Sequence, residues 1–140
     1  MRKPPLGELE QDVFRYLTER AAPLSVREVT EPFHEERGLA RTTILTVMEN
    51  LRKKSYLTRS KAEDGVFRYR LAAPRTELLR GLVRGFVENT LGGSVSPIVA
   101  YLADTGQISP SDLAELERLV DELRRARSEP NAVAEEGRPA

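Results

Sequence analysis

Three threonines are the first residues of this chain whose types and spacing could do chemistry. Thr42, Thr43 and Thr46 fall on the outer side of a predicted helix, although threonine is a poor helix former and exposed helical positions usually hold Glu, Lys or Ala. A threonine hydroxyl can hydrogen-bond a phosphate or a base edge, and its methyl group can pack on a thymine methyl. The pattern indicates a helix face that contacts something other than water.

Polar and basic side chains near these threonines suit a nucleic-acid partner. Asn50 shares their arc and can pair with adenine or reach a phosphate. Glu49 can accept a hydrogen bond from cytosine or simply point aside. The remaining candidates are cations that would neutralise phosphates: Arg41, Lys53, Arg59, Lys61, Arg68 and Arg70.

Catalysis finds little support in the residue inventory. The chain has one histidine, His34, and no cysteine, so only carboxylates remain as other strong metal ligands. His34 stands beside Phe33 and Glu35 and is expected to be a surface or packing residue. No nucleophile elbow, phosphate loop or dinucleotide fingerprint is present. We expect no enzyme activity, no catalytic residue, no cofactor and no metal site.

The charge distribution favours a polyanion as partner although the formal net charge of the chain is zero. Residues 37–75 carry 10 Lys or Arg against 3 Asp or Glu, a net charge of +7. Residues 76–140 carry 7 basic and 11 acidic residues, a net charge of −4. A field concentrated in one region can attract an anion even when the whole chain balances.

Three short helices and a hairpin are predicted to position these residues. The first helix runs from about Leu6 to Arg20, and the second begins with a capping box at Ser25 and Glu28 and stops at Gly38. Pro32 should kink the second helix or confine it to one side, because proline removes a backbone donor. A short extended piece is expected at residues 24–26, between these helices.

The third helix, residues 41–54, should turn an apolar arc inward and leave the threonines outside. That arc consists of Ile44, Val47, Met48 and Leu51. A hairpin follows in residues 56–71 around an Asp64-Gly65 turn, with Phe67, Tyr69 and Leu71 alternating with Arg68 and Arg70. Its apolar side should lie on the helices, which leaves a basic side free.

A domain boundary is predicted at residues 72–75, where the charge sign and the periodicity change. Helices are then expected at about 76–91, 96–104 and 110–127, with more apolar surface than about 50 residues can bury alone. A second copy of the chain would cover that surface. The residues expected in such a dimer contact are Leu78, Leu82, Phe86, Ile98, Tyr101, Leu102, Leu113, Leu116, Val120 and Leu123.

The chain ends are expected to be disordered, over the first four or five residues and from Ser128 onward. No signal peptide and no run of about 18 apolar residues is present, so we expect a cytoplasmic protein with no membrane contact.

The order of motifs resembles the penicillinase-repressor (BlaI/MecI) family of winged-helix transcriptional repressors. The resemblance rests on LGELEQDVFRYL, then SVREV, then LARTTILTVMENLRKKSYL, then a basic hairpin ending FRYRLAAP. It covers residues 6–74 well and the helices to about 125 loosely. The most specific part is Thr42-Thr43-Ile44 with Thr46, Leu51 and Lys54.

This resemblance implies a mainly α fold with two domains. Residues 1–75 would form a winged helix-turn-helix domain, with three helices and a small antiparallel sheet, and residues 76–127 a three-helix dimerisation domain. The implied function is a homodimeric repressor that binds a palindromic operator in double-stranded DNA and contacts it through the residues named above. A sensor protease is implied as a further partner. The family's Asn-Phe cleavage site would fall near Ala100-Tyr101, where only the aromatic residue remains.

A second interpretation stays open. The same domain could be a winged-helix protein-interaction module without specific DNA binding, whose basic hairpin meets an acidic partner. An exposed Leu45 beside the threonines would favour it.

Overall fold

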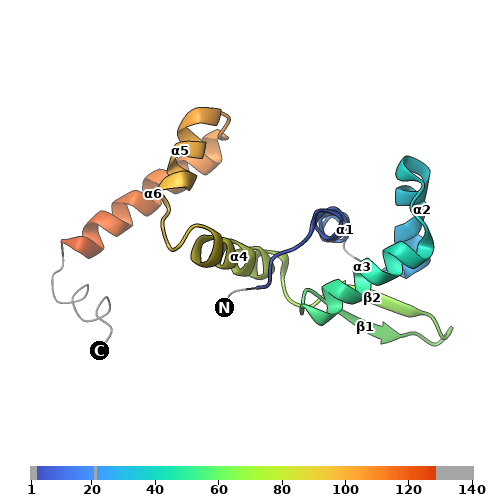
Figure 1. The fold of residues 1–140 in the computed structure, drawn as a ribbon. Helices are drawn as coiled ribbons and strands as arrows, with labels where there is room; N and C mark the ends of the chain where they lie inside the picture. The colour runs from blue at the N-terminus through green and yellow to red at the C-terminus, as the bar shows by residue number, and fades with distance from the viewer. Residues whose placement is uncertain (1–2, 21, 129–140) are drawn as a thin grey trace. The chain divides into compact units, whose positions relative to one another are not determined.

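The periodicity of the first half of the chain produces three helices and a hairpin, as the sequence predicts. The computed structural model describes residues 3–20 and 22–128. Helix α1 spans Glu8–Thr18, α2 Val26–Arg37 and α3 Arg41–Lys53, and strands β1 and β2 span Leu57–Lys61 and Phe67–Leu71 (Figure 1). The predicted mainly helical fold with a winged helix-turn-helix arrangement is confirmed.

The second helix shows which local signals decided its ends. The Glu28 backbone N–H donates to Ser25 Oγ at 3.1 Å, and the Ser25 N–H donates back to Glu28 Oε1 at 2.8 Å. Gly38 ends the helix with a φ of 67°. Of the two alternatives for Pro32, confinement of the helix to one side is wrong, because α2 continues through Pro32 to Arg37, and a kink at Pro32 stays a prediction. One missing backbone donor costs less than the burial of Val29 and Phe33 on either side of it gains.

The hairpin pairs antiparallel around Gly65, which has a φ of 81°. Leu57 lies opposite Leu71, Arg59 opposite Tyr69 and Lys61 opposite Phe67. The predicted extended piece appears as a single bridge, in which the Leu24 N–H donates to the Tyr69 carbonyl at 3.0 Å and the reverse bond is 2.8 Å. β2 is therefore paired on both edges, which anchors the base of the hairpin.

One core joins the three helices to the hairpin. The predicted inward arc of α3 is confirmed, since Ile44, Val47, Met48 and Leu51 are all buried. Phe14 and Tyr56 meet edge to face, with ring centroids 5.4 Å apart. The other buried apolar residues are Val13, Leu17, Val29, Phe33, Leu57, Tyr69 and Leu78.

The expectation of disorder in the first residues was wrong for Lys3, Pro4 and Pro5. The Lys3 backbone N–H donates to the Gly81 carbonyl at 3.0 Å, and its Nζ donates to the Ser55 carbonyl at 3.0 Å. The hydroxyl of Tyr56 donates to the Pro4 carbonyl. These contacts hold the segment against the end of α3. The disorder predicted after Ser128 lies outside the described residues.

Helix α4 spans Arg75–Gly85 and continues as a π-helical turn, η1, over Phe86–Thr90. Leu78 was expected in a dimer contact, but it is fully buried in the core of its own chain. The correction has a simple cause: α4 starts four residues after β2, so its first turn packs on the winged helix. Residues 1–94 form one unit. A functional boundary near residue 75 stays a prediction.

The second unit, residues 95–140, contains α5 (Ser96–Thr105) and α6 (Pro110–Arg127). Ser109 caps α6, since its Oγ accepts from the Asp112 N–H at 3.1 Å. None of the predicted contact residues of this unit is fully buried. Ile98, Leu102 and Leu116 are half-buried, and Tyr101, Leu113, Val120 and Leu123 are exposed. In the first unit Leu82 is half-buried and Phe86 is exposed.

No helix in the described part of the chain has the length and apolar character needed to cross a membrane.

Candidate nucleic-acid interface

The outer face of α3 is open, as the sequence predicts. Thr42, Thr43 and Thr46 are exposed, and so is Arg41 at the start of the helix. Within residues 3–20 and 22–128, the side chains of Arg41, Thr42 and Thr43 make no hydrogen bond or ion pair. The first turn of α3 therefore offers free donors and one free cation to a partner.

Thr46 differs from the other two threonines. Its Oγ1 donates to the Thr42 carbonyl at 3.0 Å, one helical turn back. The hydroxyl proton is thus used inside the helix, while the oxygen lone pairs and the methyl group stay outside. In this rotamer Thr46 can accept a hydrogen bond from an adenine or cytosine amino group, or pack on a thymine methyl.

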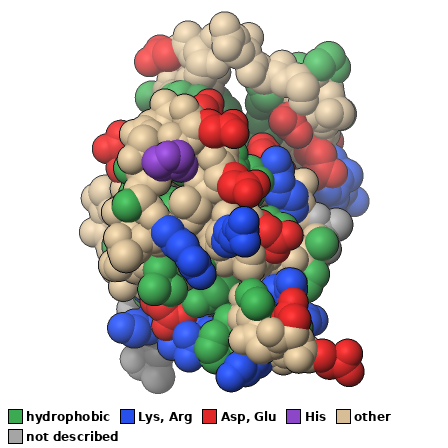
Figure 2. All heavy atoms as spheres, turned by 90° about the vertical axis from the view of Figure 1, so that its right-hand side faces the viewer, with side chains coloured by type: hydrophobic (Ala, Val, Ile, Leu, Met, Phe, Trp, Pro, Cys, Tyr) green, Lys and Arg blue, Asp and Glu red, His purple; other side chains and the backbone are tan. Residues whose placement is uncertain are grey.

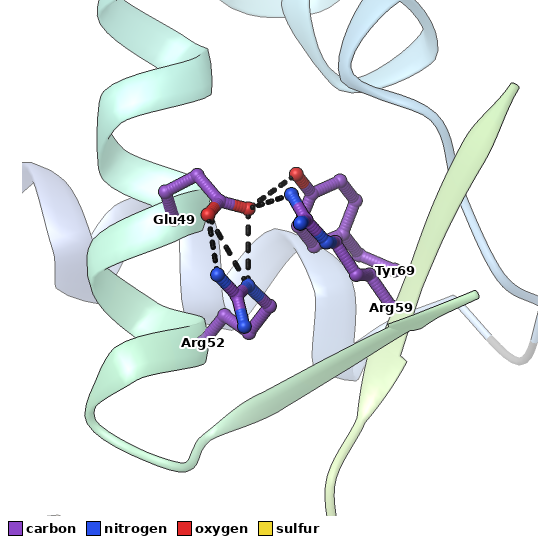
Figure 3. Close-up of polar contacts among 4 residues, drawn as sticks. All are labelled: Glu49, Arg52, Arg59 and Tyr69. Carbon is purple, nitrogen blue, oxygen red and sulfur yellow. Dashed lines mark hydrogen bonds and ion pairs between the residues drawn. The ribbon is translucent and has the colours of Figure 1, made fainter. Parts of the chain in front are cut away.

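The Glu49 side chain points toward the hairpin and not outward with the threonines. It contacts three side chains (Figure 3). Its carboxylate accepts from Arg52, with contacts between 2.8 and 3.2 Å, and from Arg59 at 3.0 Å. The Tyr69 hydroxyl donates to Glu49 Oε2 at 2.7 Å. We call these four residues the Glu49 cluster. Of the two readings of Glu49, pointing aside is the one that fits the structure.

The electrostatics of the Glu49 cluster favour the ionised acid. Hydrogen bonds from Arg52, and then the Tyr69 hydroxyl and the Arg59 charge, lower the pKa of Glu49 from 4.5 to about 2, against the opposing effect of burial. Burial and the bond to Glu49 raise the pKa of Tyr69, which keeps its hydroxyl a donor. The cluster thereby ties the C-terminal half of α3 to both strands.

Part of this cluster could have been read from the sequence. Glu49 and Arg52 stand three residues apart, the spacing of a helical ion pair. Arg59 and Tyr69 could not be assigned to it, because they reach Glu49 only once the hairpin is packed on α3. The sequence alone identifies them only as a cation and an aromatic residue of two predicted strands.

The hairpin has no single basic face, which corrects the prediction. Strand register places Arg59 and Lys61 on the same face as Tyr69, whereas Arg68 and Arg70 point to the opposite face. Residues opposite each other in an antiparallel pair share a face, so this register places two of the four cations on each face. The sequence pattern does not show which residues of the two strands share a face, because that depends on the register.

The two faces also differ in how their cations are engaged. Arg68 forms an ion pair with Asp64 at 3.0 Å, and this bond lowers the pKa of the Asp64 carboxyl. Arg70 lines a hollow beside the end of α1 together with Arg20. Among the described residues, four of the predicted contact cations have no carboxylate partner: Arg41, Lys53, Lys61 and Arg70.

The N-terminal segment and α1 form hydrogen bonds with residues at the C-terminal end of α3. Lys54 Nζ donates to the Pro5 carbonyl at 3.1 Å and to Glu10 Oε1 at 2.7 Å. Burial raises the pKa of Tyr56 to about 12, so its bond to Pro4 persists across ordinary pH. Asn50 is half-buried and Lys53 is exposed, so the last turn of the face offers one cation and one partly covered amide.

The site contains no constellation suited to catalysis or metal binding in the part of the chain that is described. No three His, Cys, Asp or Glu side chains there lie close enough to hold a metal ion. His34 is exposed, and its Nδ1 lies 3.1 Å from the Leu39 carbonyl. That contact fits the surface role expected for it.

The chain is similar to one family model and to a curated protein. The family model described as "Penicillinase repressor" matches residues 6–122. A protein named "Transcriptional regulator BlaI" from Mycobacterium tuberculosis is 38% identical over 78 residues, which are 56% of this chain and 56% of that relative. The chain thus spans about half the length of the curated relatives it matches.

Solved structures with similar chains include two bacterial proteins. The "FabT in complex with DNA" structure from Streptococcus pneumoniae has a TM-score of 0.43 and 18% identity, covering 88% of this chain and 76% of that one. The PcaV transcriptional regulator from Streptomyces coelicolor has a TM-score of 0.44 and 20% identity, covering 91% and 80%.

Proposed function

The chain belongs to the penicillinase repressor family, and from this premise we propose that it is a sequence-specific DNA-binding transcriptional repressor and not an enzyme. The observation that carries the proposal is the division of α3 into two faces. Its apolar arc is buried in the core, while Thr42, Thr43 and Thr46 are exposed beside uncompensated cations. A helix of this kind fits the major groove of B-DNA, where its N-terminal residues reach base edges.

The contacts divide into two roles. Thr42, Thr43, Thr46 and Asn50 would contact base edges or adjacent phosphates. The cations would neutralise phosphates and position the domain: Arg41, Lys53, Arg59, Lys61, Arg68 and Arg70. To contact a phosphate, Arg68 must break its ion pair with Asp64 or bind the phosphate while it keeps that ion pair. We expect its contribution to be smaller than that of Lys61, which has no carboxylate partner among the residues described.

A homodimer on a palindromic operator is the second part of the proposal. Exposed apolar side chains on α4, α5 and α6 support it, because surfaces of this kind usually mark a protein contact. A two-fold symmetric dimer presents two α3 helices to two half-sites of a palindrome. Occupation of the promoter by this dimer would exclude RNA polymerase.

A sensor protease is the proposed further partner, and its action would release the repressor from DNA. The position that corresponds to the family's cleavage site, Ala100-Tyr101, lies within α5, and 67% of Tyr101 is exposed. A protease needs an extended strand, so α5 would have to unwind locally. Mass spectrometry of the chain recovered from induced cells tests this: an intact chain after derepression would argue against cleavage.

The DNA-binding proposal is tested by titrating labelled promoter duplexes at several salt concentrations. Neutralisation of several phosphates should make log Kd rise linearly with log salt, with a slope of about 0.9 per phosphate contacted. Lys53→Ala should weaken binding to all duplexes alike and reduce the slope by about 1. A slope near zero for the wild type would exclude phosphate neutralisation and the repressor model.

Thr46→Ala tests the base-reading role, with Thr30→Ala as its matched control. Both hydroxyls donate to a carbonyl one turn back, Thr30 to Val26 at 2.7 Å, so both variants lose the same kind of intrahelical bond. Only Thr46→Ala should lower affinity for the preferred duplex more than for random duplex, by about tenfold. Equal behaviour of the two variants would contradict a base contact at Thr46.

A protein-interaction module is the second candidate function, and one observation favours it. Leu45 is 43% exposed on the outer side of α3. A thymine methyl group in the major groove can also pack against such a side chain. Retention on heparin without any duplex preference, together with stoichiometric capture of one protein, would favour this candidate over the repressor.

A further inference from the structure

The position of α4 relative to α3 decides how far apart two α3 helices lie in the proposed homodimer. Figure 2 shows the side of one chain that carries α2, α3 and the hairpin, where Lys and Arg side chains gather in the lower half of the view. This side can meet one half-site of a palindrome. The second half-site needs the α3 of a second copy, which would be joined through surfaces that include Val83, exposed on α4.

Apolar packing and one hydrogen bond hold α4 against the rest of its unit. Leu78 is fully buried in the core, and Leu79 and Leu82 pack partly against it. The Lys3 backbone N–H donates to the carbonyl of Gly81, a buried residue of α4, at 3.0 Å. Within the described chain, this is the one hydrogen bond that joins α4 to a segment outside the helix and its flanking turns. A glycine at this position has no side chain to keep the two backbones apart.

The same short segment, residues 3–5, also binds the turn that ends α3, and we call this segment the strap. Lys3 Nζ donates to the Ser55 carbonyl at 3.0 Å and lies 5.5 Å from the ring centroid of Tyr56. The Tyr56 hydroxyl donates to the Pro4 carbonyl. The strap is therefore bonded to α4 and to the end of α3 at once.

The turn after α3 depends on a serine in an unfavourable conformation. Ser55 has a φ of 70°, in the left-handed region that favours glycine. Its N–H donates to the Arg52 carbonyl at 3.0 Å, and the Tyr56 N–H donates to the Leu51 carbonyl at 2.9 Å, a pattern that ends many α-helices. Because serine adopts this conformation at an energetic cost, the bond from Lys3 to its carbonyl helps to keep the turn in place.

We propose that the strap is a positioning element that fixes α4 relative to α3 and thereby sets the half-site spacing that the dimer accepts. This inference rests on the proposed homodimer on a palindromic operator. Lys3 is central to it, because its backbone N–H bonds α4 while its side chain bonds the turn after α3. Lys3 and Tyr56 are not among the residues proposed to touch DNA, so the strap acts through position and not through a DNA contact.

Half-site spacing is a readout that a purely stabilising role of the strap would not change. One base pair added at the centre of the palindrome moves one half-site by about 3.4 Å along the duplex and turns it by about 35°. A dimer with a firmly held α4 cannot follow this change, whereas a dimer with a loosened α4 can. Wild type should therefore bind the lengthened duplex at least about tenfold more weakly than the duplex it selects from a random-sequence pool.

The experiment uses the full chain and compares two double variants. Lys3→Ala with Tyr56→Phe removes the bond from Lys3 to the turn and the bond from Tyr56 to the strap. Arg20→Ala with Tyr16→Phe is the matched control, because the Arg20 guanidinium lies 3.8 Å from the ring centroid of Tyr16 on α1. The control also loses a cation over a ring and a tyrosine hydroxyl, but away from the strap. Circular dichroism verifies that both variants are folded.

The strap variant should bind the lengthened duplex no more than about threefold more weakly than the selected one, and its affinity for a single half-site should stay within about twofold of wild type. The control should keep the wild-type preference. If the double variant fails to fold, Lys3→Ala alone replaces it, since it keeps every core side chain, and the preference for the selected spacing should still fall by at least about twofold.

An unchanged spacing preference in the folded strap variant, or an equal relaxation in the control, would overturn the inference and leave the repressor function intact. A wild type that binds one half-site as tightly as the palindrome would instead refute the dimer, and the inference with it. A wild type that selects no duplex would refute DNA binding as well.

Discussion

Replacing Glu49 by Gln should destabilise the domain through the loss of one charge. A pKa lowered from 4.5 to about 2 corresponds to about 3 kcal/mol of stabilisation of the ionised form. The Glu49 side chain is 20% exposed and its two arginine partners are about one third exposed, so solvent screens part of this. We expect a loss of about 1–2 kcal/mol in the free energy of unfolding at pH 7.

The pH dependence follows from the direction of the pKa change. Glu49 has a lower pKa in the folded chain than in the unfolded chain, so its stabilising effect is complete above about pH 4.5. It should decline as the pH falls from 4.5 and disappear near pH 2, where wild type and Glu49→Gln become equally stable with respect to this group. Tyr69 remains a hydrogen-bond donor throughout this range, because its pKa is raised.

Urea unfolding followed by far-ultraviolet circular dichroism suits the measurement, since the chain contains no tryptophan. Protein concentration must be the same in all samples, because a dimer gains stability with concentration. Glu31→Gln is the matched control: Glu31 is exposed on α2 and makes no hydrogen bond or ion pair within the described chain. Equal losses for both variants at pH 7, or a difference that persists unchanged below pH 2, would refute the reasoning.

Three other substitutions test separate parts of the structure. Ser25→Ala removes the acceptor for the Glu28 N–H and should cost about 1 kcal/mol in urea unfolding; no loss would mean that the capping box is dispensable. Tyr56→Phe removes the bond to the Pro4 carbonyl and should cost about 1 kcal/mol by the same assay, whereas an unchanged midpoint would argue against the brace under α3. Leu123→Glu places a charge on the exposed apolar side of α6 and should raise the dimer dissociation constant at least about tenfold in sedimentation equilibrium; an unaffected dimer would place the interface elsewhere.

The helices and their ends could be predicted from the sequence because their causes are local. Ser25 and Glu28 stand three residues apart in the chain, and a capping box needs nothing else. The inward arc of α3 follows from the 100° rotation per residue, so the exposed threonines followed as well. The turn at Gly65 likewise depends on one residue that tolerates a positive φ.

Contacts between residues far apart in the chain could not be predicted from the sequence. Leu78 has the same apolar character as Leu123, yet the first is buried within its own chain and the second is exposed. Only the short connection between β2 and α4, seen in three dimensions, separates these two outcomes. Lys3 and Pro4 were expected to be disordered, but they bond to Ser55 and Tyr56, each 52 residues away in the chain.

The sequence by itself determined that α3 has a buried side and a hydroxyl-bearing side, because helical geometry relates neighbours in the chain through a constant angle. The tertiary structure alone decided which cations are available beside that helix. Strand register put Arg59 on the face of Tyr69 and Phe67, and packing brought it to Glu49, while Arg68 went to the other face. Register and packing are set by the energy of the whole core, and a pattern of residue types along one strand does not contain that information.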